Sequence, residues 1–369
     1  MRLLATLFPL ILLLSACSSK PSSTAPGPSG ATVTGGFLLE PDHKRLLNDA
    51  SGPLATGDYA FNPAAEAFVD KLVREHGFDR QQLHSVLAQT RRLDWVIKLM
   101  DRQAPVGRPP SGPNGAWLRY RSKFITPDNI QNGVAFWDQY QDALQRAWQV
   151  YGVPPQIIVG IIGVETRWGR VMGKTRIIDA LATLAFAYPR RAEYFASELE
   201  TFLLMARTEG DDPLDLRGSY AGAMGYGQFM PSSFKNYAVD FNGDGHINLW
   251  DPEDAIGSVA NYFKAHGWVK GGPVAVPATG QAPMLDQGFQ TRYAVSELTA
   301  AGLRPQSSLA GYPEASLLRL DYGSYYQYWF GLPNFYAITR YNHSTHYAMA
   351  VWQLGEAVGR ARQGQGLLD

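Results

Sequence analysis

The chain has 369 residues, of which 45% are hydrophobic and 12% aromatic, enough to bury a large core divided over two or three domains. Lys and Arg together number 33, as do Asp and Glu, so the formal net charge is zero. This composition excludes a disordered chain, and the charge balance excludes the basic excess typical of nucleic-acid-binding proteins. We therefore expect a folded protein that does not bind nucleic acid.

The N-terminus has the pattern of an export signal. Arg2 precedes a mostly apolar run at residues 3–14, which is too short to span a bilayer comfortably. The following Leu14-Ser15-Ala16-Cys17 resembles the bacterial lipobox, which predicts a lipoprotein signal peptide at residues 1–16 and lipidation of Cys17, the only cysteine. An ordinary secretory signal with an incidental cysteine is the alternative.

The segment 17–38 is predicted to be the acylated cysteine followed by a flexible linker, because it is rich in Pro, Gly, Ser and Thr and lacks apolar periodicity. Ser18 after Cys17 favours delivery to the outer membrane. We expect a periplasmic protein held by its lipid in the inner leaflet of that membrane.

Most of the remaining chain has apolar residues at three- and four-residue spacing, which predicts helices. The expected helices are 62–76, 79–90, 92–103, 127–151, 154–167, 176–187, 190–208, 231–239 and 252–266. Between 271 and about 326, Gly, Pro and short apolar runs predict a small β-containing unit with one helix near 295–302. A last amphipathic helix is expected at about 344–362. The predicted fold class is mainly α (α+β).

Glu165 is the first candidate catalytic residue. It ends the apolar run 154–164, and no other acidic residue lies between Asp142 and Asp179. Desolvation raises the pKa of a carboxyl, so Glu165 is expected to keep its proton near neutral pH, as a general acid must. The apolar residues at helical spacing on its face are Ile158, Ile161, Ile162 and Trp168.

A structural ion pair is the competing interpretation of Glu165. Four cationic residues follow it closely, and a buried Glu paired with an Arg is common in protein cores. These residues are Arg167, Arg170, Lys174 and Arg176.

The segment 217–233 contains four glycines, two tyrosines and Gln228, which suits neither a helix nor a strand. Such a segment can form an irregular wall where the backbone approaches a ligand. A plain Gly-rich connector is the alternative.

The segment 240–251 matches the register of an EF-hand loop, with oxygen-bearing side chains at positions 1, 3 and 5 and Gly245 at position 6. Position 12 is Asp rather than Glu, so bidentate binding and the preference for calcium over magnesium are open. We expect a structural Ca²⁺ and no organic cofactor; a metal-free turn held by Asx hydrogen bonds is the alternative. The expected ligands are Asp240, Asn242, Asp244, His246 through its carbonyl, and Asp251.

These motifs together resemble the membrane-bound lytic murein transglycosylase B family. The resemblance rests on Gly-Val-Glu-Thr-Arg-Trp-Gly-Arg at 163–170, on the Gly-rich segment 218–232 and on the EF-hand-like loop, and it extends from about residue 39 to the end. It implies a lysozyme-like core with an additional α-helical domain, a small β domain and a calcium loop. The implied units are 39–115, an N-terminal α-helical domain joined by helix 190–210; 116–270, the catalytic core with loop 240–251; 271–330, the β domain; and 331–369, returning to the core.

The resemblance also implies roles for individual residues. Glu165 corresponds to the only catalytic acid/base, which acts on the bond between N-acetylmuramic acid and N-acetylglucosamine. Ser219 and Gln228 correspond to polar residues lining the cleft, and Arg190 and Arg191 to residues that meet the stem peptide. The other implied sugar contacts are Tyr120, Tyr262, Tyr341, Asn342 and Tyr347.

A single acid implies substrate assistance. Ordinary retaining and inverting glycosidases use two carboxyls, whereas the acidic residues of loop 240–251 are assigned to the metal. With the substrate's 2-acetamido group stabilising C1, the muramyl C6 hydroxyl can attack and give a 1,6-anhydro product. The implied partners are glycan strands, stem peptides and the membrane, with other cell-wall enzymes as further candidates.

Two alternatives stay open from the sequence. A hydrolytic muramidase would need a second carboxylate, for which Asp179 is the nearest candidate. A non-catalytic peptidoglycan-binding lipoprotein would use the same aromatic cleft without cutting the glycan.

Overall fold

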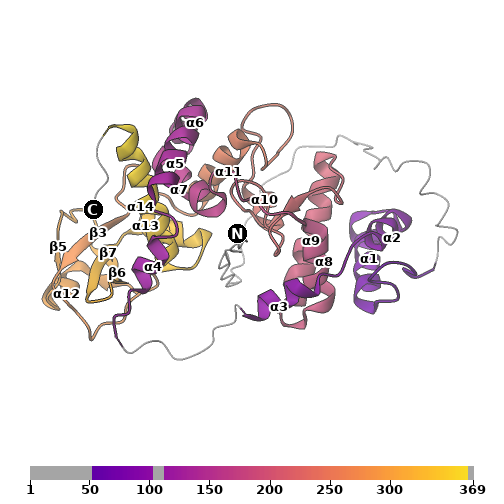
Figure 1. Cartoon of the computed structure of the whole chain (residues 1–369), viewed down its shortest axis with the longest axis horizontal. Coiled ribbons are helices and arrows are strands. Elements are labelled where there is room, and N and C mark those ends of the chain that lie inside the picture. Colours follow the sequence, from indigo (N-terminus) through magenta and orange to yellow (C-terminus); the bar gives the residue numbers. More distant parts are fainter. Residues whose placement is uncertain (1–51, 103–111, 365–369) are drawn as a thin grey trace, which may run out of the picture.

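The structure is a computed structural model that describes residues 52–102 and 112–364. The predicted signal peptide, Cys17 and linker lie outside the described residues. Helices α1 and α2 lie at one end of the molecule and a small β-sheet at the other, with a helical core between them (Figure 1).

The N-terminal helices begin at polar caps. Asn62 caps α1 by accepting hydrogen bonds from the backbone N–H groups of Ala64 and Ala65, and Asp79 caps α2 in the same way. The three helices of this part are α1 (Pro63–His76), α2 (Arg80–Ala88) and α3 (Asp94–Arg102).

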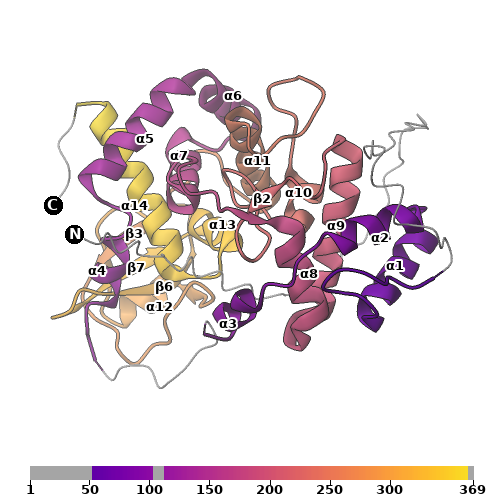
Figure 2. The same cartoon turned by 45° about the vertical axis from the view of Figure 1, so that its right-hand side comes forward.

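Two long helices join this N-terminal part to the core: α8 (Ile177–Ala187) and α9 (Ala192–Glu209), linked by the 3₁₀ turn η2 (Pro189–Arg191). His76 of α1 lies 2.7 Å from a carboxylate oxygen of Glu200 in α9, and Lys71 pairs with the same carboxylate. Tyr59 shares a buried hydrogen bond with Thr183 of α8. Figure 2 shows α8 and α9 side by side, next to α1 and α2.

Helix α7 (Pro155–Thr166) is the centre of the core. Every residue from Ile157 to Val164 is buried, as expected for a helix that is apolar on all sides. Its neighbours are α5 (Pro127–Gln139), α6 (Gln141–Tyr151), α11 (Pro252–Ala265) and α14 (Thr345–Arg362).

The predicted continuous helix at 127–151 is wrong: α5 and α6 are separate helices divided at Tyr140, whose φ is −113° and ψ is 29°. The physical reason is that α5 packs against α14 while α6 packs against α11, and one straight helix could not cover both. Three further helices belong to this region: α4 (Ala116–Arg121), α10 (Pro231–Tyr237) and α13 (Pro333–Tyr341). The sequence patterns did not predict α4 and α13.

Two sheets complete the described fold. The short strands β1 (Thr175–Arg176) and β2 (Arg217–Gly218) pair with each other. The larger sheet is antiparallel in the order β4-β6-β7-β3-β5 and, with helix α12 (Val295–Ala300), encloses its own apolar cluster that includes Leu317 and Phe330. Its strands are β3 (Ala275–Thr279), β4 (Tyr293–Ala294), β5 (Arg304–Pro305), β6 (Glu314–Asp321) and β7 (Tyr326–Gly331).

In the described part of the chain, no helix is long and apolar enough to cross a membrane by itself. Helices α6 and α7 meet the length and composition requirement only as a pair bent by 117°, and α7 is the buried centre of the core.

The contact between α7 and α14 predicts that Gly355→Ala destabilises the fold. A Cβ at Gly355 would lie 2.1 Å from the carbonyl oxygen of Gln156, so the two helices would have to separate. We expect a net loss of about 1–2 kcal/mol in the free energy of unfolding, because overpacking outweighs the gain in helix propensity. Denaturant unfolding measures it. Gly112→Ala is the control, since a Cβ there meets nothing within 4 Å; equal stability of the two variants would contradict the prediction.

Candidate active site

The C-terminal end of α7 positions Glu165. The helix stops one residue later, at Thr166, because Arg167 and Trp168 adopt left-handed backbone conformations with φ of 51° and 56°. Thr166 is fully buried and its hydroxyl donates to the carbonyl of Tyr226, 3.0 Å away. This bond fixes the end of α7 to the Gly-rich segment, so Glu165 is held on a rigid element.

The Glu165 carboxyl accepts a hydrogen bond from the hydroxyl of Tyr347, at 2.5 Å from Oε1. Burial raises the pKa of Glu165 to about 7, against the opposing influence of this hydrogen bond. A paired guanidinium would have lowered the pKa instead. The neutral acid is therefore well populated near pH 7, as the sequence predicts, although part of the residue keeps contact with solvent.

Three tyrosines lie within the electrostatic influence of Glu165. Burial, and next the charge of Glu165, raises the pKa values of Tyr120, Tyr341 and Tyr347, so their phenol groups stay protonated. Tyr341 donates to the carbonyl of Gly227 at 2.6 Å, which connects it to the Gly-rich segment. The site therefore surrounds one carboxyl with neutral hydrogen-bond donors.

The Gly-rich segment is an irregular, buried wall, as the sequence predicts. The hydroxyl oxygen of Ser219 accepts from the N–H groups of Ala221 and Ala223, at 3.3 and 3.0 Å. Gln228 has a left-handed φ of 53°, and its side-chain amide donates to the carbonyls of Gly225 and Met172. Both side chains are thus fixed by the backbone around them.

Two further residues predicted to contact the sugar, Tyr262 and Asn342, belong to the elements next to the Glu165 site. Tyr262 donates to the carbonyl of Arg340 at 2.6 Å and stacks on His266 with ring centroids 3.9 Å apart. Tyr262 also packs edge-on against Tyr341, with ring centroids 4.8 Å apart. Asn342 follows directly as the C-cap of α13. These contacts extend the aromatic cluster beyond Glu165.

The two predicted stem-peptide residues lie on η2, between α8 and α9. Arg190 is largely exposed and lies 3.6 Å from a carboxylate oxygen of Asp101 in α3. The Arg191 guanidinium lies over the ring of Tyr194, 4.3 Å from its centroid.

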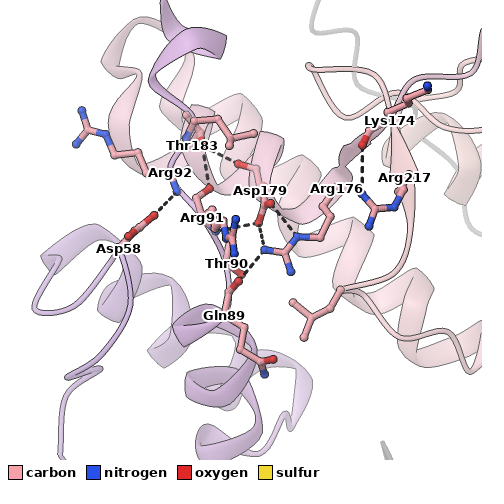
Figure 3. Close-up of polar contacts among 12 residues, drawn as sticks. Asp58, Gln89, Thr90, Arg91, Arg92, Lys174, Arg176, Asp179, Thr183 and Arg217 are labelled. Carbon is pink, nitrogen blue, oxygen red and sulfur yellow. Dashed lines mark hydrogen bonds and ion pairs between the residues drawn. The ribbon is translucent and has the colours of Figure 1, made fainter.

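Asp179, the candidate second carboxylate, has a structural role (Figure 3). Arg176 binds both of its oxygens, at 2.8 and 2.9 Å, and the backbone N–H of Arg91 donates to Oδ1 at 2.9 Å. Arg176 also donates to the carbonyl of Gln89. Asp179 therefore holds the N-terminal helices against α8, and both of its oxygens accept hydrogen bonds from the scaffold, which argues against a role in activating water.

The loop at 240–251 is ordered by its own acidic residues. Asp240 accepts from the N–H groups of Gly243 and Gly245, and Asp244 accepts from that of His246. The side chains that turn into the loop carry oxygen, so the donor set fits a hard cation such as Ca²⁺. Asp251 differs from the others: its carboxylate caps α11 by accepting from Glu253 and Asp254.

Two residues that the sequence analysis did not single out help to build these sites. Thr166 ties α7 to the Gly-rich wall, and the fully buried Asp254 accepts from the N–H groups of Phe241, Asn242 and Asn248. Asp254 lies in the first turn of a helix, where an acid is expected for its interaction with the helix dipole, so its position gave no separate signal.

Known proteins share this architecture. Residues 60–356 match the family model described as the transglycosylase SLT domain. The chain is 71% identical to the membrane-bound lytic murein transglycosylase B of Escherichia coli (strain K12) over 359 residues, which are 97% of this chain and 98% of that protein.

Solved structures agree. The Escherichia coli lytic transglycosylase Slt35 in complex with bulgecin A is 72% identical, with a TM-score of 0.81 over 88% of this chain and 100% of that chain. The structure of Slt35 in complex with calcium is 71% identical to this chain, with a TM-score of 0.81 over 88% of this chain and 100% of that chain. SltB3 from Pseudomonas aeruginosa in complex with NAG-anhNAM-pentapeptide is 30% identical, with a TM-score of 0.69 over 80% of this chain and 78% of that chain.

The family match spans most of the chain, and the solved relatives have the same lysozyme-like fold. The chain therefore belongs to the membrane-bound lytic murein transglycosylase B family and is a lytic murein transglycosylase.

Proposed function

We propose that Glu165 is the single acid/base with which this transglycosylase cuts the β-1,4 bond between N-acetylmuramic acid and N-acetylglucosamine. Neutral Glu165 gives its proton to the glycosidic oxygen as the C1–O bond breaks, while the 2-acetamido oxygen bonds to C1. The resulting carboxylate then removes the proton of the C6 hydroxyl as that oxygen attacks C1 and displaces the acetamide. Glu165 ends protonated, and the product is 1,6-anhydromuramic acid.

The observation that carries this proposal is the raised pKa of Glu165, about 7, in a site whose other ionisable neighbours are protonated tyrosines. A group with a pKa near the working pH can both give and take a proton. The hydrogen bonds that both Asp179 oxygens accept within the scaffold support substrate assistance over a two-carboxylate hydrolysis.

The substrate contacts are assigned around this carboxyl. Tyr347 orients Glu165, Ser219 and Gln228 line the scissile bond, and Arg190 and Arg191 meet the carboxylates of a stem peptide. The glycan rings lie along Tyr120, Tyr262, Tyr341 and Asn342. The complexes of relatives with bulgecin A and with NAG-anhNAM-pentapeptide support peptidoglycan strands with stem peptides as the substrate.

The enzyme works in the cell envelope, which the name of the membrane-bound relative supports. The finer assignment is a periplasmic chain anchored through lipidated Cys17 in the inner leaflet of the outer membrane. Residues 17–38 then give the catalytic core reach toward the glycan, and other cell-wall enzymes are candidate partners there.

The loop 240–251 binds a structural Ca²⁺, which the calcium complex of Slt35 supports. Asp240, Asn242, Asp244 and the carbonyl of His246 provide oxygens. Asp251 is the acid expected at position 12, and the buried Asp254, whose carboxylate faces the loop, is the other residue able to close the ligand set.

Replacing the proposed acid tests the mechanism. Glu165→Gln keeps the shape of the side chain but removes its proton transfer, so we expect release of anhydromuropeptides from sacculi to fall by at least about 10²-fold. Mass spectrometry of the products measures this. Glu297→Gln, an exposed glutamate in α12, should behave as the wild type. Undiminished anhydro product from Glu165→Gln, or reducing muramyl ends from the wild type, would argue against the proposal.

The pH profile tests the hydrogen bond from Tyr347. The wild-type rate should fall as pH rises through about 7, because Glu165 then loses the proton that it must donate. The Tyr347 hydroxyl lowers the pKa of Glu165, so Tyr347→Phe should move this alkaline limb to higher pH while lowering the maximal rate by up to about a hundredfold through poorer orientation. Tyr328→Phe, in the core of the small sheet, is the matched control. A limb that stays in place would show that another group controls it.

Thermal unfolding tests the calcium site. Added Ca²⁺ should raise the melting temperature of the wild type, because a ligand that binds the folded state stabilises it. Asp244→Asn should weaken this response, whereas Asp142→Asn, an exposed aspartate in α6, should preserve it. Comparing Asp251→Asn with Asp254→Asn shows which acid closes the loop. A melting temperature independent of Ca²⁺ in the wild type would refute the site.

A further inference from the structure

A pocket lies at the opposite end of α7 from Glu165. It has a volume of about 230 Å³, and its lining includes Gln156 at the start of α7, Trp352 and Glu356 on α14, Trp268 after α11, and Pro273 before β3. Gln156 and Glu165 are nine residues apart on α7, about 14 Å along the helix axis. The pocket is therefore separate from the catalytic carboxyl but built on the same two helices.

Two partly exposed indole rings face this pocket, and each is held by an aromatic neighbour. Trp329 of β7 packs at 86° against Trp352 with ring centroids 5.8 Å apart. Phe263 packs at 65° against Trp268 with centroids 5.7 Å apart. Both rings keep part of their surface accessible. They form rigid platforms, which lose little conformational entropy when a ligand binds.

Polar groups accompany the two rings. Burial raises the pKa of Glu356, with Arg360 as the opposing influence. Gln156 adds a side-chain amide. The indole nitrogen of Trp268 is buried, and among the described residues it finds no hydrogen-bond acceptor. Because this nitrogen is buried, Trp268 offers a ligand in the pocket its ring surface and not its N–H.

We propose that this pocket is a second, non-catalytic glycan site that binds one N-acetylhexosamine ring of a peptidoglycan strand. The C–H faces of a pyranose are apolar and match the electron-rich faces of indole rings. Its hydroxyls and acetamide provide donors for Glu356 and acceptors for Gln156. The volume is below the range of about 300–1,000 Å³ typical of drug-sized ligands, which suits a single ring.

The charges favour a sugar over an amine of the stem peptide. Glu356 is the acid that lines the pocket, and Arg360, one turn later on α14, acts on it electrostatically. This cation would oppose a bound ammonium group but leaves a neutral sugar unaffected.

This second site depends on the proposed function, because its ligand is the same glycan that the enzyme is proposed to cut. Binding at both ends of α7 would hold the enzyme on an insoluble wall while the catalytic cleft releases product, since a second contact raises the effective concentration of strand at the first. Loss of the pocket should thus weaken the action of the enzyme on the insoluble wall and leave its rate on a short soluble glycan unchanged.

Binding is tested with the full chain carrying Glu165→Gln, so that the glycan stays intact. Co-sedimentation with purified sacculi gives the apparent Kd, and titration with chitotetraose gives the number of sites per chain. Trp352→Ala and the isosteric Glu356→Gln should each weaken sacculus binding about tenfold, equivalent to about 1.4 kcal/mol, and reduce the chitotetraose sites from two to one. Trp95→Ala, which replaces an exposed tryptophan on α3, is the control.

Three outcomes would overturn the proposal. They are a single chitotetraose site before mutation, unchanged sacculus binding by Glu356→Gln, and displacement of the glycan from this site by a sugar-free stem peptide.

Catalysis gives a separate measurement. In the active chain, Glu356→Gln should raise KM for sacculi several-fold, without changing kcat or the rate on a soluble two-disaccharide glycan. Undiminished cleavage by Glu165→Gln would count against the proposed acid/base but not against the pocket. A normal KM for sacculi in Glu356→Gln would count against the pocket and leave the role of Glu165 intact.

Discussion

The hydrogen bond between Tyr347 and Glu165 joins the two helices on which the rest of the structure depends. Glu165 lies in the last turn of α7, which is buried on all sides, and Tyr347 lies in the first turn of α14. Helix α14 crosses α7 so closely that Gly160 and Gly355 face backbone carbonyls of the other helix. A buried carboxyl needs such a partner, because an unsatisfied polar group in the core is costly. Burial raises the pKa of Glu165 to about 7, and the hydrogen bond from the Tyr347 hydroxyl opposes this rise while it orients the acid.

Other buried and half-buried carboxylates show why Glu165 is different. Asp179 is paired with Arg176, Glu200 with Lys71 and His76, and each joins the N-terminal helices to α8 or α9. Glu198 is 3% exposed and accepts from the hydroxyl and the N–H of Ser232 at the start of α10. These acids connect elements of the scaffold. Glu165 has phenols around it instead of such a partner, which leaves its proton available for chemistry.

The core also determines how the peripheral elements meet. Helix α14 returns to α7 after the small sheet, so residues from the two ends of the catalytic region, Glu165 and Tyr347, become neighbours. The same return brings Trp352 and Glu356 to the start of α7 and beside Trp268. The aromatic clusters at the two ends of α7 are thus a consequence of a single helix crossing.

The sequence by itself determined most helices, the burial and raised pKa of Glu165, the irregular Gly-rich wall and the order of acids in the loop, because these follow from local periodicity, backbone preference and spacing. Only the tertiary structure decided what lies far apart in the chain: Tyr347 on Glu165, Arg176 on Asp179, and Asp254 behind the loop while Asp251 caps α11. It also divided the expected helix 127–151 at Tyr140, because its halves pack on different partners. Local sequence sets which conformations a segment favours, whereas burial and hydrogen bonding between distant segments decide which side chains share a site.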